Sequence, residues 1–188
     1  LPAAVIGRRR EMQILHEVLE AAGGGQGSIV LLAGDAGIGK THLAQGVAGE
    51  AAGRGARVVW VSCHELASSS PYWPWVQIVR ALEDTQEAVE GSQPPGSSLS
   101  QLVTFVPELA WRSGDLLPAP GEQTGNARML LFDSIVGLLR QASRESVLVL
   151  VVDDLEWCDQ ESLLVFRVLS AEVRRMRLLV IATLEDAV

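Results

Sequence analysis

The chain has 188 residues, 48% of them apolar, and a formal net charge of -8 at pH 7. This composition supports a sizeable core and speaks against global disorder, and the acidic excess speaks against a direct nucleic-acid contact, because neutralising phosphates needs clustered lysine and arginine. The sequence holds no apolar run of the roughly 18 residues that a membrane span needs, and its first twelve residues lack a signal-peptide pattern. We therefore expect a cytoplasmic protein without membrane contact.

The first third of the chain predicts two helices and two strands in alternation. Residues 8–22 repeat apolar side chains at helical spacing, and a glycine-rich turn ends that helix. Residues 28–33 are a short apolar run typical of a buried strand. A glycine-rich loop follows, then a helix over about 40–52 and a second strand over 57–63.

The remainder predicts further helices and two more strands. Helical patterns lie near 72–90, 98–110 and 126–143, separated by turn-rich loops at 91–98 and 113–126, which we expect to be mobile. Alternating strands and helices indicate a mostly parallel sheet under helices. The last elements are a doubly buried strand over 146–154, a helix over roughly 160–175 and a strand over 177–183.

Residues 34–41, "GDAGIGKT", fit the pattern Gly-x-x-x-x-Gly-Lys-[Ser/Thr] between a strand and a helix. Phosphate oxygens must be met by backbone N–H groups, so such a loop curls tightly and needs residues without bulk at its contacts. Lys40 can reach the β- and γ-phosphates, and Thr41 can offer a hydroxyl to Mg²⁺. We predict that ATP with Mg²⁺ binds here. The predicted binding residues are Gly34, Asp35, Ala36, Gly37, Ile38, Gly39, Lys40, Thr41 and His42.

Two carboxylates follow the third predicted strand and could serve the metal and the reaction. Asp153 and Asp154 end the run "VLVLVVDD", and alternation along a strand sends their side chains in different directions. Asp153, together with Thr41, is the better candidate for Mg²⁺, and Asp154 for polarising the attacking water beside the catalytic Lys40. The residues leave open which aspartate takes which role.

Several segments together resemble one family in order along almost the whole chain. "VIGRRREMQILHEVL", "LLAGDAGIGKTHLA", "VVDDLEWCDQESLLVF" and "LLVIATLED" are similar to the ATPase domain of the STAND class, as in large ATP-binding bacterial regulators of the LuxR type. The resemblance implies a P-loop NTPase sandwich acting as a switch between a helical-repeat sensor and a DNA-binding output region, both outside these 188 residues. It also implies that Gly7 and Arg8 lie near the adenine.

Two departures from that family bear on activity. Relatives carry an arginine two residues after the threonine of the fourth strand, where this chain has Glu185. The fifth strand and the helical lid that the family implies are also missing from the sequence, so we expect a sheet of four to five strands truncated before its last strand. Because closure normally completes such sites, we expect ATP hydrolysis to be weak in this fragment.

The resulting division is a single ATPase core over residues 1–188 with four segments. We predict an N-terminal helix and linker, a unit that holds the phosphate loop, a helical insertion, and a last segment. The last segment comprises the strand that ends in Asp153 and Asp154, a helix, and the strand over 177–183. Their bounds are 1–27, 28–63, 64–145 and 146–188.

The two cysteines and the segment 68–84 could each serve either core packing or function. Cys63 and Cys158 lack metal-ligand spacing and are expected to be reduced core residues. The segment 68–84, rich in tryptophan and proline, favours an anchored helix start over an exposed partner surface.

The sequence is compatible with three candidate functions. The leading one is a slowly hydrolysing ATP/ADP switch, and the second is a non-hydrolysing nucleotide-binding platform for assembly. A DNA-loading ATPase is third, and the acidic balance speaks against it. The exposed edge of the P-loop strand suggests some self-association.

Overall fold

The structure, a computed structural model, describes residues 8–65, 71–86 and 125–186. Four parallel strands form one sheet in the order β1-β4-β3-β2. The strands are β1 (Ser28–Gly34), β2 (Arg57–Ser62), β3 (Leu148–Asp153) and β4 (Leu178–Glu185). The α-helices are α1 (Arg9–Gly23), α2 (Lys40–Gly53), α3 (Trp73–Gln86), α6 (Gly125–Ala142) and α7 (Gln160–Glu172), with short 3₁₀ turns η3 (Leu155–Trp157) and η4 (Val173–Arg175).

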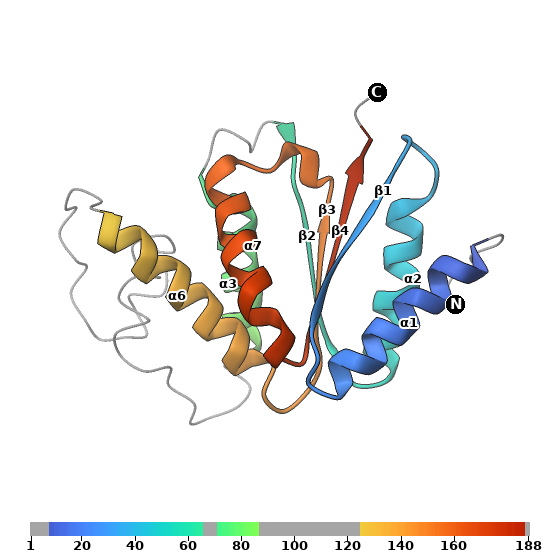
Figure 1. Cartoon of the computed structure of the whole chain (residues 1–188), viewed down its shortest axis with the longest axis horizontal. Coiled ribbons are helices and arrows are strands. Elements are labelled where there is room, and N and C mark those ends of the chain that lie inside the picture. The colour runs from blue at the N-terminus through green and yellow to red at the C-terminus, as the bar shows by residue number, and fades with distance from the viewer. Residues whose placement is uncertain (1–7, 66–70, 87–124, 187–188) are drawn as a thin grey trace.

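Helices cover both faces of the sheet, as Figure 1 shows. All six residues of β3 and the first six of β4 are buried, which explains their uninterrupted apolar sequences. Alternate side chains enter opposite cores: Val149 and Val151 pack with α1 and α2, whereas Leu148, Leu150 and Val152 pack with α3, α6 and α7. The sheet therefore separates two apolar cores.

The predicted fold class is confirmed: this is an α/β sandwich with a parallel sheet. Both β3 and β4 lie between β1 and its successor along the chain, β2. Because all four strands run in parallel, their carboxyl ends meet at one edge. Gly34 there pairs with Glu185, and Ser62 with Asp153.

The described elements differ from the predicted ones mainly at their ends. The strand predicted over 177–183 continues to Glu185, because β4 stays paired with β1 as far as Gly34. The predicted helix over 98–110 and the loop at 91–98 lie outside the described residues, as does 113–124 of the second loop. The four-segment division of the chain stays a prediction.

The tryptophan-rich start of α3 is anchored in the core. Trp75 is 1% exposed, and its indole N–H donates to the carbonyl of Ser162 in α7 over 3.0 Å. The buried Tyr72 donates its hydroxyl hydrogen bond to Glu161 over 2.8 Å. Both contacts favour the packing interpretation of this segment.

Among the residues that the structure describes, no helix combines the length and the apolar character that would let it cross a membrane.

The central strand offers a direct test of this packing. Leu150 is fully buried in β3, so Leu150→Ala is expected to lower the free energy of unfolding by about 2–5 kcal/mol through lost burial and a residual cavity. Leu31 on the edge strand β1 is 58% exposed, and Leu31→Ala should change the free energy of unfolding by no more than about 0.5 kcal/mol. Urea unfolding measures both, and equal losses would contradict the assignment of β3 to the centre.

Candidate functional site

The loop between β1 and α2 has the backbone that a phosphate cup requires. Gly34, Gly37 and Gly39 have φ angles of 154°, 72° and 94°, which side chains other than glycine rarely adopt. The side chains of Asp35, Ala36 and Ile38 are exposed, so the loop faces solvent. The first amide of α2 to pair within the helix is that of Leu43, which donates to the Gly39 carbonyl. The amides of residues 40–42 therefore precede the helical ladder, where anions bind.

The Lys40 ammonium is held against its own loop rather than extended into solvent. Its Nζ donates to the carbonyl of Gly34 over 2.7 Å and to the carbonyl of Asp35 over 2.9 Å. These contacts place a positive charge at the loop. A phosphate would offer a stronger, charged acceptor than the two carbonyls.

The Asp153 carboxylate at the end of β3 accepts hydrogen bonds from two hydroxyl groups on two other elements. The Thr41 hydroxyl in α2 donates to Asp153 Oδ1 over 3.0 Å, and the Thr183 hydroxyl in β4 donates to the same oxygen over 2.5 Å. Asp153 is 8% exposed and Thr183 is fully buried. A carboxylate and a hydroxyl are oxygen donors of the kind that Mg²⁺ prefers. The donor set therefore fits a Mg²⁺–polyphosphate, with Thr41 and Asp153 as the residues able to hold the metal.

Asp154 leaves the strand in a left-handed conformation, with φ 59° and ψ 50°, which aspartate tolerates better than most residues. Its backbone N–H donates to the Thr183 hydroxyl over 2.9 Å. Partial burial, followed by the charges of Asp153 and Glu156, raises the pKa of Asp154, while His64 and Lys40 act in the opposite direction. A carboxylate with a raised pKa is better suited to accept a proton.

The remaining predicted site residues lie at the rim of the loop. An Arg8 guanidinium nitrogen donates to the carbonyl of Ile38 over 2.6 Å, which brings the start of α1 to the loop. His42 is half-buried in the first turn of α2. Gly7 lies outside the described residues. The arrangement thus gathers Arg8, Lys40, Thr41, Asp153 and Asp154 at one end of the sheet.

The role of Thr183 in orienting Asp153 could not be inferred from the sequence alone. The available signal was a polar side chain near the end of an otherwise apolar strand, but the role depends on β4 lying next to β3. Glu185, at the position where the resemblance implies an arginine, lies beside the loop. It pairs in register with Gly34, its side chain is exposed, and the N–H of Asp186 donates to the Gly34 carbonyl over 3.3 Å. Two acidic residues, Glu185 and Asp186, therefore lie beside the loop.

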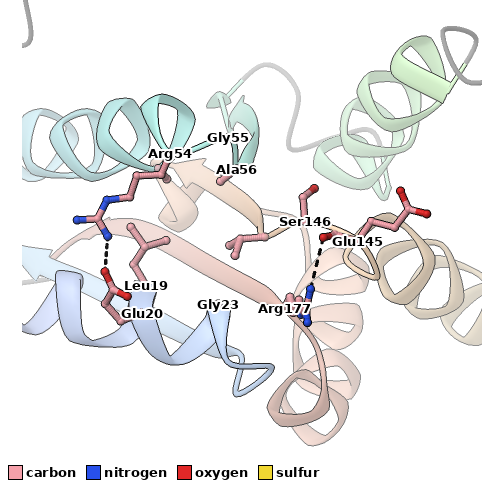
Figure 2. A pocket seen from close by; sticks show the side chains of 11 residues that line it. Leu19, Glu20, Gly23, Arg54, Gly55, Ala56, Glu145, Ser146 and Arg177 are labelled. Atoms are coloured by element: carbon pink, nitrogen blue, oxygen red, sulfur yellow. Dashed lines mark hydrogen bonds and ion pairs between the residues drawn. The ribbon is translucent and has the colours of Figure 1, made fainter.

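A separate cavity of about 330 Å³ lies at the opposite end of the sheet, where β2, β3 and β4 begin (Figure 2). Its guanidinium groups already have partners: Arg54 binds Glu20 and Glu50, and Arg177 donates to the carbonyl of Glu145 over 3.4 Å. None of the predicted nucleotide-binding residues lines this cavity. It is therefore no part of the candidate site.

Comparison with known proteins agrees with this geometry. The family model described as "AAA ATPase domain" matches residues 4–181. No curated protein matches the chain.

Among solved structures, the chain shares its fold with a chain of the origin recognition complex at low identity. The chain is 17% identical to a chain in the structure of Drosophila ORC bound to DNA, with a TM-score of 0.54, and the match covers 99% of this chain. AMPPCP-bound DnaA from Aquifex aeolicus and a DNA replication initiation factor are each 18% identical, with TM-scores of 0.41 and coverage of 98% and 97% of this chain. The chain spans only 39–40% of the length of these proteins.

The raised pKa of Asp154 predicts a pH-dependent effect of Asp154→Asn on stability. Above its folded-state pKa, the ionised carboxylate costs the native state free energy, and below its unfolded-state pKa this cost vanishes. Asparagine also tolerates the left-handed backbone but does not ionise. Asp154→Asn should therefore raise the free energy of unfolding near neutral pH, and the gain should disappear below the ordinary aspartate pKa of about 3.9.

Urea unfolding over a pH series measures this difference. Asp133→Asn, on the exposed side of α6, is the matched control and should change stability little at any pH. A gain for Asp154→Asn that persists unchanged into acid would contradict the proposed cause.

Proposed function

We propose that this chain, which belongs to the AAA ATPase domain family, binds ATP with Mg²⁺ at residues 34–41 and hydrolyses it slowly as the switch of a cytoplasmic bacterial signalling or transcriptional regulator. One observation carries the nucleotide assignment. The Thr41 hydroxyl lies 3.0 Å from Asp153 Oδ1, although 112 positions separate the two residues in sequence. This contact joins the phosphate loop to the acidic strand.

The proposed roles follow from where each group lies. The exposed loop and the first amides of α2 bind phosphate oxygens, and Lys40 exchanges its two carbonyl partners for the β- and γ-phosphates. Thr41 and Asp153 hold the metal, and Thr183 orients Asp153. A bound Mg²⁺ would neutralise charge that develops on the phosphate oxygens.

Asp154 is the proposed group that orients the attacking water and accepts its proton. Its backbone turns away from the line of β3, so its carboxylate need not share the Thr41 side of Asp153. The raised pKa of Asp154 favours proton acceptance over that of an ordinary surface aspartate. Arg8, bound to the Ile38 carbonyl, and Gly7 are the proposed neighbours of the adenine.

The regulator role rests on the resemblance of the four segments named above to large LuxR-type proteins, not on the solved structures. In that proposal the sensor and DNA-binding regions belong to the full-length protein and contact this domain. The net charge of -8 gives no support to direct DNA binding by this domain, although the ORC structure is bound to DNA. The open edge of β1 is the proposed surface for self-association.

A second candidate function is a nucleotide-binding platform without turnover. Its support is Glu185, which replaces the arginine that the resemblance implies and pairs in register with Gly34. An anion beside the loop would oppose the charge that accumulates on a γ-phosphate in the transition state.

Binding of nucleotide is tested by Lys40→Ala. We expect the dissociation constant for ATP to rise roughly ten- to hundredfold, because a charge-assisted contact is lost. The melting temperature should change little, since Lys40 is only half-buried and its bonds go to loop carbonyls. Calorimetric titration measures the affinity, and Arg167→Ala on the exposed side of α7 removes the same charge as a control. Equal affinities of Lys40→Ala and the control would contradict the assignment.

Turnover separates the two candidate functions. If the chain hydrolyses ATP, Asp154→Asn should lower the rate by about 10²–10⁴-fold while ATP affinity stays within about tenfold of the original. Phosphate release at saturating MgATP, with Asp133→Asn as control, measures this. Wild-type release no faster than that of Lys40→Ala would favour the platform.

A further inference from the structure

The cavity where β2, β3 and β4 begin exists because residues around it carry little or no side chain. Its volume of about 330 Å³ lies at the lower end of the range of small-molecule sites. Gly23 ends α1, and Gly55, with a φ of 84°, lies in the turn before β2. A Cβ atom added at Gly23 would meet Val147 Cγ2 at 3.9 Å, an ordinary contact. The hollow at Gly23 is therefore space that a larger residue would fill.

Part of the cavity lining consists of apolar side chains that the core holds in place. Leu19 from α1 is 5% exposed, and Ala51 from α2 is 1% exposed. Both belong to the core between these helices and the sheet, and Val147, just before β3, packs against it. An apolar ligand body would lose contact with water against these three residues, which favours its binding.

The polar part of the lining holds a guanidinium group that has no acidic partner among the described residues. The Arg54 guanidinium is neutralised by Glu20 and Glu50. Arg177, in contrast, donates to the neutral backbone carbonyl of Glu145 over a long 3.4 Å. Figure 2 shows the Glu145 carboxylate turned away from Arg177. A negatively charged ligand group would give Arg177 a stronger acceptor than this carbonyl.

A hydroxyl group adds a second donor to the lining. Ser146 lines the cavity, and its hydroxyl makes no hydrogen bond within the described ranges of the chain. A carboxylate offers two oxygens with several lone pairs, so it can accept from a guanidinium and from a hydroxyl. The donors Arg177 and Ser146 thus match a carboxylate better than a cation or a neutral group.

We propose that this cavity binds a small monocarboxylate with an apolar body. The carboxylate accepts from Arg177, and the apolar body packs against Leu19, Ala51 and Val147. An inorganic anion would leave the apolar lining without a partner, and a neutral apolar molecule would leave the charge of Arg177 without one. Because the cavity lies at the end of the sheet opposite residues 34–41, its occupation does not depend on nucleotide.

The first experiment titrates the full chain at neutral pH with 3-phenylpropanoate and, separately, with its uncharged amide. Backbone amide chemical shifts measured by NMR report both the affinity and the place of binding. We expect a dissociation constant for the acid in the millimolar range, as suits a ligand of about eleven non-hydrogen atoms. The shifts should gather at residues 19–23, 51–56, 145–147 and 177.

The amide has nearly the same shape but lacks the charge, so it should bind at least about tenfold more weakly than the acid. Equal affinities for the two compounds would overturn the carboxylate assignment. Shifts that gather away from the cavity, or no shifts at all, would overturn the site itself.

Arg177→Gln tests the residue assigned to the carboxylate. It should weaken binding of the acid by about tenfold and leave the affinity for the amide unchanged, because only the acid uses the charge. Arg174→Gln, on the exposed turn η4 and outside the lining, removes the same charge as a control and should bind the acid like the wild type. A purely structural role of Arg177 would weaken both compounds alike, which would contradict the proposal.

Gly23→Leu tests the cavity independently of charge. The added side chain should fill the hollow beside Val147 and abolish binding of the acid, while the melting temperature does not fall, since leucine favours the helix more than glycine. Gly49→Leu adds the same side chain on the exposed side of α2, where a Cβ atom has open space, and should bind the acid normally. Folded Gly23→Leu protein that still binds the acid would overturn the proposal.

Two further titrations separate this site from the phosphate loop. Inorganic phosphate should shift the cavity residues far less than the acid does, and phosphate binding there with equal affinity would overturn the need for an apolar body. Lys40→Ala should bind the acid like the wild type, and a loss of acid binding in this variant would overturn the independence of the two sites. A failure of ATP to bind would count against the proposed function alone and leave the cavity result standing.

Discussion

The geometry of the candidate site depends on how the buried Asp153 carboxylate is satisfied. A buried ionised group costs several kcal/mol unless it is hydrogen-bonded or paired. Here one carboxylate oxygen accepts bonds from Thr41 and Thr183, on α2 and β4 respectively. The Thr183 hydroxyl in turn accepts the N–H of Asp154. One carboxylate thus fixes the distance between the phosphate loop, the acidic strand and the neighbouring strand.

The two sides of the site differ in how firmly they are held. The Asp153 side is built on strands whose residues are buried on both faces, so its geometry follows from the register of the sheet. On the loop side, the residues between Gly34 and Gly39 are exposed. The side chains of Lys40 and Arg8 donate hydrogen bonds to backbone carbonyls of this loop. We expect nucleotide binding to rearrange the Lys40 side chain and to leave Asp153 nearly in place.

Much of the fold was predictable because local patterns agree with the final structure. The uninterrupted apolar run of β3 indicated a doubly buried strand, and the glycines with Lys40 and Thr41 indicated a phosphate loop. The role of Thr183 was not predictable, because it depends on β4 lying next to β3. The contacts of the Lys40 side chain were not predictable either, because it binds two loop carbonyls that only the curled backbone brings within reach.

The proposed function depends above all on Thr41 and Asp153 holding Mg²⁺ together with a nucleotide. Calorimetric titration of ATP with and without Mg²⁺, in wild type and in Asp153→Asn, tests it most directly. We predict that Mg²⁺ tightens ATP binding to the wild type and to Asp133→Asn, and that Asp153→Asn loses this tightening while remaining folded. An identical Mg²⁺ dependence in wild type and Asp153→Asn would contradict the claim.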